Sequence, residues 1–203
     1  MAKQKVYALG IDLGGTKTLA AIVDVTTGEV ISSERKRTRA NKGQEYVSQH
    51  VINLSTAALE SAKLPAESTI IGVGIGAAGQ IDRKNGVVLD APNLGVKDMR
   101  LGDLLRKQFG QPVAVGNDVE VAALGEHVYG AGRGYSTFVV IFVGTGIGGA
   151  IVHNGRLYSG LTGTAGEVGH ITIQAGGRIC GCGGRGCLEA YASRTAITKA
   201  IMG

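Results

Sequence analysis

Three cysteines and one histidine stand close together near the C-terminal end of the chain. Cys180, Cys182 and Cys187 are all the cysteines of the 203 residues, and His170 lies a short distance before them. Three thiolates and one imidazole complete the four-coordinate shell of a closed structural zinc ion, with no position left open for catalysis. Several glycines among the cysteines allow the backbone to turn tightly around an ion. The sequence therefore predicts a structural Zn²⁺ site with these four residues as ligands.

Two other interpretations of the cysteines are a disulfide pair with one cysteine left over and three unrelated buried thiols. The number of cysteines is odd, and Cys180 and Cys182 are too close in sequence to form a bridge easily. No secretory segment is expected before them. These observations favour the zinc site.

Two glycine-rich loops lie upstream of the cysteines. Each loop stands between two short apolar runs: Gly14–Thr18 between residues 6–11 and 19–25, and Gly144–Gly149 between residues 138–143 and 150–152. Short runs rich in Val and Ile and bounded by glycine predict buried strands, and the following Thr27-Gly28 and Asn154-Gly155 pairs predict turns. The sequence therefore predicts one strand–loop–strand design that is used twice.

Neither loop matches the best-known nucleotide motifs. Gly15 is followed by Thr16-Lys17-Thr18, not by the Gly-Lys-Ser/Thr of a P-loop. The second loop and residues 74–79 satisfy G-x-G-x-x-G, but each is followed by a strand pattern where a dinucleotide site requires a helix, and residues 80–89 indicate a hairpin. Such hairpin tips either present backbone N–H groups to a phosphate, with Thr and Lys17 as additional donors, or only permit tight turns.

The spacing of apolar residues predicts three helices. The patterns are Val47, Val51, Leu54 and Ala58; Leu101, Leu104, Leu105 and Phe109; and a helix that begins near Asp118 and directs Val121, Ala122 and Leu124 inward.

Asp118 stands at the predicted start of the third helix, directly after an apolar run at residues 113–115. An aspartate at this position is either a helix cap or a general base. Its place at the end of a strand, where α/β proteins build ligand sites, favours the base.

Five motifs together carry a family resemblance. They are D-x-G-G-T-K-T at 12–18, Gly116-Asn117-Asp118, G-T-G-I-G-G at 144–149, Glu167-Val168-Gly169-His170, and C-x-C-G-G-x-G-C-x-E ending at Glu189. From about residue 6 to its last residues the chain resembles the ROK family of sugar kinases and related repressors, and within it the bacterial ATP-dependent glucokinases. The resemblance implies an α/β fold of the actin-like, hexokinase-like (ribonuclease H-like) type. It implies two domains, which we expect at residues 1–118 and 119–203, the second incomplete in this chain.

The resemblance implies ATP-dependent phosphorylation of a hexose at its 6-hydroxyl, with Asp118 as the general base and with ATP and Mg²⁺ as cofactors beside Zn²⁺. The residues expected to bind nucleotide phosphates or to organise Mg²⁺ are Asp12, Gly14, Gly15, Thr16, Lys17, Thr18, Gly144, Thr145, Gly146 and Gly148. Those expected to bind sugar are Gly79, Asn93, Asn117, Asp118, Glu167, His170 and Glu189. If one ring nitrogen of His170 binds zinc, the other can donate to a sugar hydroxyl.

The segment at residues 91–95 resembles the glucokinase form of a loop near the sugar, which favours glucose and its conversion to glucose 6-phosphate. The alternatives are a kinase for another hexose or an N-acetylated amino sugar, a non-catalytic sugar-sensing regulator of the same family, and a metal-stabilised fragment without activity.

Composition fits a cytoplasmic globular enzyme, with 44% hydrophobic and 18% charged residues and no apolar run long enough to span a membrane. The net charge of +5 comes partly from basic residues at 35–42, which we interpret as a solvated loop. Without interleaved aromatic residues or a helix-turn-helix before residue 6, this run does not predict nucleic-acid binding. The resemblance implies a homo-oligomer, either a dimer or a tetramer.

Chains of the ROK family are usually considerably longer than 203 residues. The last residues, 194–203, have the pattern of the opening turns of a helix. The expected alternatives are a fragment, or a shortened protein whose adenine pocket is absent or is supplied by another chain.

Overall fold

The computed structural model describes residues 5–161 and 163–203. The chain divides into two compact units, the N-terminal unit Met1–Val121 and the C-terminal unit Ala122–Gly203. The N-terminal unit contains β1 (Val6–Leu13), β2 (Lys17–Asp24), β3 (Val30–Arg37), η1 (Ala40–Lys42), α1 (Gln44–Ala62), β4 (Thr69–Ala77), β5 (Gln80–Asp82), β6 (Val87–Ala91), η2 (Pro92–Leu94), β7 (Val96–Met99), α2 (Leu101–Phe109) and β8 (Val113–Asn117). Helix α3 (Asp118–Tyr129) crosses the boundary, and the C-terminal unit adds β9 (Phe138–Val143), β10 (Ile147–His153), β11 (Arg156–Tyr158), η3 (Val168–His170), α4 (Glu189–Ala192) and α5 (Arg194–Met202).

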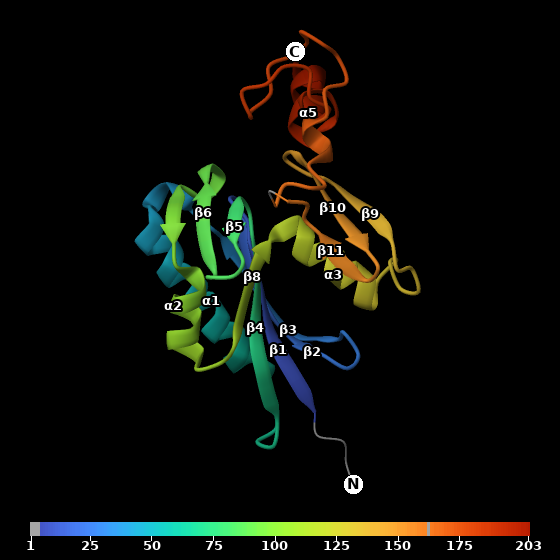
Figure 1. The fold of residues 1–203 in the computed structure, drawn as a ribbon. Coiled ribbons are helices and arrows are strands. Elements are labelled where there is room, and N and C mark those ends of the chain that lie inside the picture. The colour runs from blue at the N-terminus through green and yellow to red at the C-terminus, as the bar shows by residue number, and fades with distance from the viewer. Residues whose placement is uncertain (1–4, 162) are drawn as a thin grey trace. The chain divides into compact units, whose positions relative to one another are not determined.

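The N-terminal unit is built on a five-stranded sheet with the order β3-β2-β1-β4-β8 (Figure 1). β1, β2 and β3 are antiparallel neighbours, whereas β4 pairs in parallel with both β1 and β8. Parallel neighbours end at the same edge of a sheet. The C-terminal ends of β1, β4 and β8 therefore meet at one edge, where α/β folds build ligand sites.

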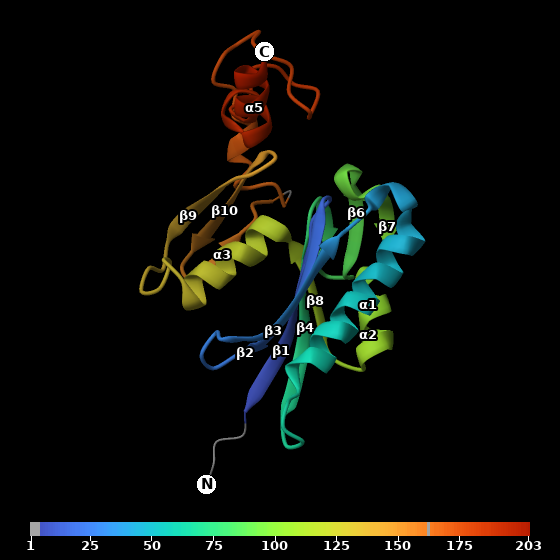
Figure 2. The same ribbon diagram turned by 180° about the vertical axis from the view of Figure 1, so that it is seen from behind.

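The two helices predicted for this unit are confirmed. α1 and α2 cover one face of the sheet (Figures 1 and 2), and α1 buries all four of its predicted apolar positions. On β1 the alternate residues Tyr7, Leu9, Ile11 and Leu13 are buried in the same core. Because side chains alternate along a strand, Asp12 points to the opposite face.

A small antiparallel sheet with the order β5-β6-β7 follows β4. The predicted hairpin at residues 80–89 is confirmed, and Gly86 of its turn has a φ of +68°. The Asp82 carboxylate accepts the backbone N–H of Asn85 at 3.1 Å and so closes the turn. The G-x-G-x-x-G pattern at 74–79 leads into a strand, as expected.

The C-terminal unit contains a three-stranded antiparallel sheet with the order β11-β10-β9. Asn154 and Gly155 form the predicted turn between β10 and β11, with φ values of +51° and +73° that suit a type I′ hairpin. The chain then runs through η3 and the cysteine segment into α4 and α5 (Figure 1).

The two sheets repeat one pattern, as the sequence predicts. The order β11-β10-β9 corresponds to β3-β2-β1. In both units the glycine-rich loop joins the first two strands of the pattern, β1 to β2 and β9 to β10. Within the described residues, β9 has no strand in the place that β4 takes beside β1. Val139, Ile141 and Val143 of β9 are each more than half exposed.

Two predictions about local structure are wrong. On α3, Val121 and Leu124 are 37% and 38% exposed, and Ala123 is the residue that is buried. Val121 lies over Gly76 and Gly116, but these glycines offer no side chain to cover it. Arg35, Lys36 and Arg37 belong to the edge strand β3, not to a loop, although their side chains are exposed as expected. No helix in the part of the chain that the structure describes combines the length and apolarity needed to cross a membrane.

Candidate active site and metal centre

The polar residues of the N-terminal unit collect at the C-terminal edge of its sheet. Leu13 of β1 pairs with Ala77 of β4, and Ala77 pairs with Asn117 of β8. Asp12 therefore lies at the end of β1, the first glycine-rich loop follows this end, and Asp118 follows the end of β8 at the same edge. This is the position in which parallel strands gather side chains for ligand binding.

Asn117 and Asp118 divide the roles of cap and candidate base between them. Asn117 Oδ1 accepts the backbone N–H groups of Val119 and Glu120 at 3.0 and 3.4 Å, so Asn117 caps α3. Its Nδ2 donates to the carbonyl of Gly79 at 3.2 Å. Asp118 Oδ1 also accepts the Val119 N–H, at 2.9 Å. Since Asn117 satisfies the helix end, the Asp118 carboxylate is not needed as the cap.

Both carboxyl groups at this edge bind protons more tightly than an exposed aspartate does. Burial raises the pKa of Asp118, and the N–H of Val119 opposes this effect. The pKa of Asp12 is raised first by desolvation and then by the negative charge of Asp118, while Arg35 lowers it. A carboxylate whose ionisation is disfavoured by a neighbouring negative charge is stabilised by a nearby cation.

The first glycine-rich loop is a β1–β2 hairpin tip that Thr38 holds from the side. The N–H of Thr38 donates to the carbonyl of Thr16 at 3.0 Å, and its hydroxyl donates to the carbonyl of Gly14 at 2.5 Å. Thr18 is fully buried, and its hydroxyl lies 3.0 Å from that of Thr38. Because Thr38 uses its one proton on Gly14, Thr18 is the donor of this bond. Thr18 therefore stabilises the loop from its buried side, whereas Thr16 and Lys17 are exposed at the tip of the loop.

Thr38 is a residue that the sequence interpretation missed. It follows the basic strand β3 and is completely buried. Its partners Gly14 and Thr18 lie far from it in the sequence, and no motif connects them. Only the pairing of β2 with β3 brings them together.

Asn93 lies against the first glycine-rich loop. A Cβ atom on Gly15 would overlap the backbone carbonyl of Asn93 and touch its Cβ. Asn93 stands in η2, directly after β6. The structure thus brings this predicted sugar residue next to a predicted phosphate residue.

Gly79 has a backbone conformation that other residues rarely adopt. Its φ is +113°, and a Cβ atom there would overlap the carbonyl of Asp90 and the side chain of Ala91. Gly79 therefore fixes the approach of the chain after β4 to β6, while its carbonyl binds Asn117.

Gly79→Ala is expected to lower the free energy of unfolding by about 1–3 kcal/mol, because it combines strain at positive φ with overpacking. Chemical denaturation monitored by circular dichroism measures this loss. Gly74→Ala is the matched control, since Gly74 lies in β4, shortly before Gly79, and a Cβ there meets nothing within 4 Å. Equal stability of the two variants would contradict the assigned role of Gly79.

The second glycine-rich loop is the β9–β10 hairpin tip of the C-terminal unit. Gly144, Thr145 and Gly146 form the tip, and the N–H of Gly144 donates to the carbonyl of Gly146 at 2.8 Å. Gly148 lies inside β10, where it pairs with Phe142. The strand continues past Gly149, so this loop is not a dinucleotide motif, as expected.

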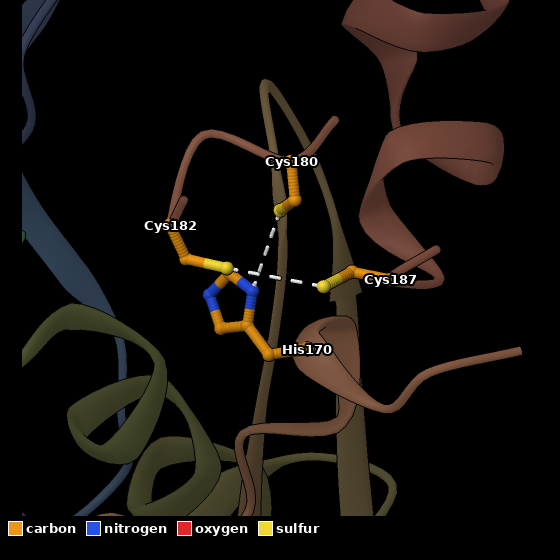
Figure 3. A group of neighbouring side chains, drawn as sticks. All are labelled: His170, Cys180, Cys182 and Cys187. Atoms are coloured by element: carbon orange, nitrogen blue, oxygen red, sulfur yellow. Dashed lines mark hydrogen bonds between the residues drawn. The ribbon is translucent and has the colours of Figure 1, made fainter. Parts of the chain in front are cut away.

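The four predicted metal ligands come together (Figure 3). His170, Cys180, Cys182 and Cys187 each offer one ligand atom, and all four atoms lie within 4.8 Å of one another. His170 Nδ1 is 3.6 Å from Cys180 Sγ, and Cys182 Sγ is 3.8 Å from Cys187 Sγ. A tetrahedral zinc ion with ordinary bond lengths would separate its ligands by about 3.6 Å for N and S and about 3.8 Å for two S atoms. The cluster therefore has the dimensions of a metal site.

The alternative of a disulfide does not fit this geometry. The cysteines are free, and the 3.8 Å between Cys182 Sγ and Cys187 Sγ is far above a bonded distance of about 2.05 Å. Burial, followed by the neighbouring thiols, raises the pKa of Cys187 to about 11, whereas the backbone N–H of Gly184 lowers the pKa of Cys182. A bound cation would favour the thiolate form of all three sulfurs.

Glycines shape the turn around these sulfurs. Gly183 and Gly186 have φ values of +88° and +79°, and a Cβ on Gly186 would overlap the carbonyl of Gln174. The N–H of Cys180 donates to the carbonyl of Gly184 at 2.9 Å. The tight turning expected from the sequence is confirmed.

The remaining predicted sugar residues lie around the metal cluster. Since Nδ1 of His170 faces Cys180, its Nε2 is the outward nitrogen, and it lies 4.0 Å from the Glu167 carboxylate. Both side chains are exposed by about a third or more, at 36% and 56%. Glu189 behaves differently, because its Oε2 accepts the backbone N–H of Ile147 at 2.8 Å and its Oε1 lies 3.8 Å from Cys180 Sγ.

The predicted site residues therefore form two groups. Within the N-terminal unit the structure assembles Asp12, Gly14, Gly15, Thr16, Lys17, Thr18, Gly79, Asn93, Asn117 and Asp118. Within the C-terminal unit it assembles Gly144, Thr145, Gly146, Gly148, Glu167, His170, Cys180, Cys182, Cys187 and Glu189.

Comparison with known proteins gives consistent matches over nearly the whole chain. The sequence pattern of the ROK family matches residues 8–203. A glucokinase from Halalkalibacterium halodurans is 40% identical over 194 residues, which are 95% of this chain and 58% of the relative. A xylose repressor from Caldicellulosiruptor bescii is 34% identical over 193 residues, which are 95% of this chain and 48% of the repressor.

A solved structure agrees with these matches. The crystal structure of a ROK family glucokinase from Streptomyces griseus in complex with glucose and AMPPNP has a TM-score of 0.82 at 37% identity, and the match covers 95% of this chain and 59% of that one. The chain thus spans less than two thirds of the length of the glucokinases that it matches.

Proposed function

Since the chain belongs to the ROK family and has the α/β actin-like ATPase fold of its glucokinase neighbours, we propose that it acts in the ATP-dependent phosphorylation of a hexose at the 6-hydroxyl. Glucose is the proposed substrate and glucose 6-phosphate the proposed product. The likeness to glucokinases at 37–40% identity supports this proposal. The observation that carries the proposal is the position of Asp118, which is half-buried at the edge of the sheet as the first residue of α3, a helix that Asn117 caps.

Asp118 is proposed as the general base. Phosphoryl transfer needs an oriented hydroxyl, neutralised phosphate charge and one group to accept a proton. In its ionised form the Asp118 carboxylate takes the proton of the sugar 6-hydroxyl as that oxygen forms its bond to the γ-phosphorus of ATP, while the bond from this phosphorus to the bridging oxygen breaks and ADP leaves. Asn117 holds the start of α3, and with it Asp118, through the N–H groups of residues 119 and 120.

The two glycine-rich loops are proposed to bind the phosphates of ATP. Backbone N–H groups at the exposed tips suit anions, and Thr16, Lys17 and Thr145 can add side-chain donors. Thr18 is given a supporting role, because its hydroxyl is buried and bonded to Thr38. Asp12 is proposed to hold Mg²⁺, which would neutralise phosphate charge; its raised pKa beside Asp118 fits a site that favours a cation.

Glu167 and His170 of the C-terminal unit are proposed to bind sugar hydroxyls, and Gly79 and Asn93 are the proposed sugar-binding residues of the N-terminal unit beside Asn117 and Asp118. The outward Nε2 of His170 is a donor when Nδ1 is a metal ligand, and the exposed Glu167 carboxylate is an acceptor. Glu189 can contribute as well, because a carboxylate bonded to one N–H keeps further acceptor positions.

The metal cluster is proposed to hold a structural Zn²⁺ ion. Its donor set of three sulfurs and one nitrogen is closed and soft, which suits zinc and leaves no position for water. Zinc would fix the ring of His170 and the turn at residues 180–187. Its contribution is structural, and no proton or phosphoryl group passes through it.

A sugar-sensing regulator is the second candidate, because a xylose repressor is 34% identical over 95% of this chain. A regulator has no need of Asp118 or of intact phosphate loops. Both are present here, which favours the kinase.

A panel of hexoses tests the proposal. Purified protein loaded with zinc is incubated with ATP, Mg²⁺ and each sugar, and ADP formation is followed with coupled enzymes. We expect glucose to be turned over fastest. Faster turnover of N-acetylmannosamine would contradict the assignment of glucose, and sugar binding without ADP formation from any hexose would favour the regulator.

A further inference from the structure

The second glycine-rich loop depends on contacts from outside its own hairpin. Gly144, Thr145 and Gly146 lie in sequence between β9 and β10, and glycine leaves such a tip free to adopt many conformations. The contacts that fix it come from a segment more than forty residues further along the chain. That segment, residues 189–195, directly follows the last cysteine of the metal cluster.

Helix α5 holds one side of the loop at its first residues. The N–H of Arg194 donates to the carbonyl of Gly144 at 3.0 Å, and the guanidinium of Arg194 donates to the hydroxyl of Thr145 at 3.0 Å. The hydroxyl of Thr195 donates to the carbonyl of Thr145 at 2.7 Å. The side-chain hydroxyl and the backbone carbonyl of Thr145 are therefore both hydrogen-bonded to residues of α5.

Glu189 holds the other side of the loop. Its Oε2 accepts the N–H of Ile147, the first residue of β10, at 2.8 Å. The carboxylate also lies against Gly146, where a Cβ atom would overlap it. The absence of a side chain at Gly146 is what allows Glu189 to reach the loop.

Glu189 is itself positioned by the metal cluster. It follows Cys187 by two residues and is the first residue of α4, so the turn that holds this cysteine also sets where the Glu189 side chain begins. The fourth ligand, His170, follows Gly169, where a Cβ atom would overlap the carbonyl of Ile147. The backbone carbonyl of Ile147 therefore packs against Gly169, directly before the histidine, and its N–H donates to the Glu189 carboxylate, which follows the last cysteine.

We propose that Glu189 is a positioning residue that couples the metal cluster to the second glycine-rich loop: the bound metal sets the Glu189 carboxylate against the Ile147 N–H and so keeps residues 144–147 in one conformation. The coupling itself does not depend on the proposed function. Only its purpose, which is to prepare the loop for the phosphates of a nucleotide, rests on that function. The metal would then stabilise the second glycine-rich loop, which is proposed to bind nucleotide phosphates, as well as the ring of His170.

Hydrogen exchange of the loop amides in the full chain tests this coupling without any need for catalysis. Glu189→Ala removes the acceptor, so amides of residues 144–147 should exchange about tenfold faster or more while the metal stays bound. Glu189→Gln keeps an acceptor oxygen and should exchange like the unaltered protein. Removing the metal with a chelator should reproduce the effect of Glu189→Ala.

The first glycine-rich loop, residues 14–18 of the N-terminal unit, is the internal reference and should not change. If Glu189→Ala fails to fold, Gly146→Ala provides the second variant, because its methyl group displaces the carboxylate and leaves Glu189 and the cluster intact. Loop exchange that is unchanged in the metal-loaded Glu189→Ala or Gly146→Ala protein, or after metal removal, would overturn the proposal.

Binding measurements separate this role from a sugar contact. We expect Glu189→Ala to raise the Kd for a non-hydrolysable ATP analogue several-fold more than the Kd for glucose. A selective loss of glucose affinity with unchanged loop exchange would make Glu189 a sugar ligand and would refute the coupling. The exchange result stands whether or not the chain phosphorylates a sugar.

Discussion

Asp118→Asn is expected to lower kcat for hexose phosphorylation by about 10²- to 10⁴-fold, which is the usual contribution of a general base. The amide keeps the size of the side chain and can still accept the N–H of Val119, so the start of α3 should remain intact. What it loses is the ability to accept the proton of the sugar hydroxyl. Coupled ADP detection measures kcat, and calorimetric titration measures glucose binding, which should change little.

Asp103→Asn is the matched control, because Asp103 also stands in the first turn of a helix of the N-terminal unit. Its carboxylate pairs with Arg100 and Arg106 at the surface, away from the groups given a role in the reaction. This variant should keep the kcat of the unaltered protein. Loss of glucose binding together with turnover in Asp118→Asn would make Asp118 a binding residue and not a base.

The pH profile gives the same prediction an independent check. Burial raises the pKa of Asp118 above the ordinary 3.8, and a general base works only when it is deprotonated. The rate should therefore fall as the pH drops through this raised pKa, so that the acidic limb lies above pH 3.8. In Asp118→Asn the residual rate should lack this limb.

Cys182→Ser is expected to abolish metal binding and to unfold the segment from His170 to Cys187. Structural zinc sites in small domains contribute about 10–16 kcal/mol of apparent binding energy at neutral pH, and loss of one thiolate removes much of it. Elemental analysis should give about one zinc per unaltered chain and almost none in the variant. Limited proteolysis should then cut the cysteine segment first, because this segment, which the structure describes in full, lies between η3 and α4 and contains no helix or strand of its own.

Arg185→Ala controls for the loop itself, since Arg185 is exposed within the same turn and is not a ligand. It should retain the metal and resist proteolysis like the unaltered protein. Iron in place of zinc, or a fully folded Cys182→Ser protein without metal, would contradict the assignment of a structural zinc site.

The strands beside the two glycine-rich loops and the first two helices could be predicted because their signals are local, whereas the basic strand β3 was expected to be a loop. Alternation along β1 and helical spacing along α1 describe one buried face each, and glycine with a preceding polar residue marks the hairpin turns. The cysteine cluster was equally accessible, because its ligands are chemically distinctive and lie within one short segment.

What could not be predicted depends on contacts between distant residues. Thr38 holds the first loop only because β3 pairs with β2, and Glu189 reaches Ile147 across 42 positions in the sequence. The apolar face of α3 was misjudged for a related reason, because periodicity shows that a face is apolar but not what covers it. The family resemblance gave Glu189 a sugar contact, whereas its bond to the second glycine-rich loop is visible only in the three-dimensional structure.

We propose above all that this protein transfers a phosphoryl group from ATP to the 6-hydroxyl of glucose. The most direct measurement is phosphorus NMR of the product formed when zinc-loaded protein is incubated with ATP, Mg²⁺ and glucose, with 6-deoxyglucose as the matched substrate. We expect a phosphate ester on the C6 oxygen of glucose and no ester from 6-deoxyglucose. A protein that carries its metal and binds both glucose and ATP but forms no sugar phosphate, or that forms an ester at another oxygen, would contradict it.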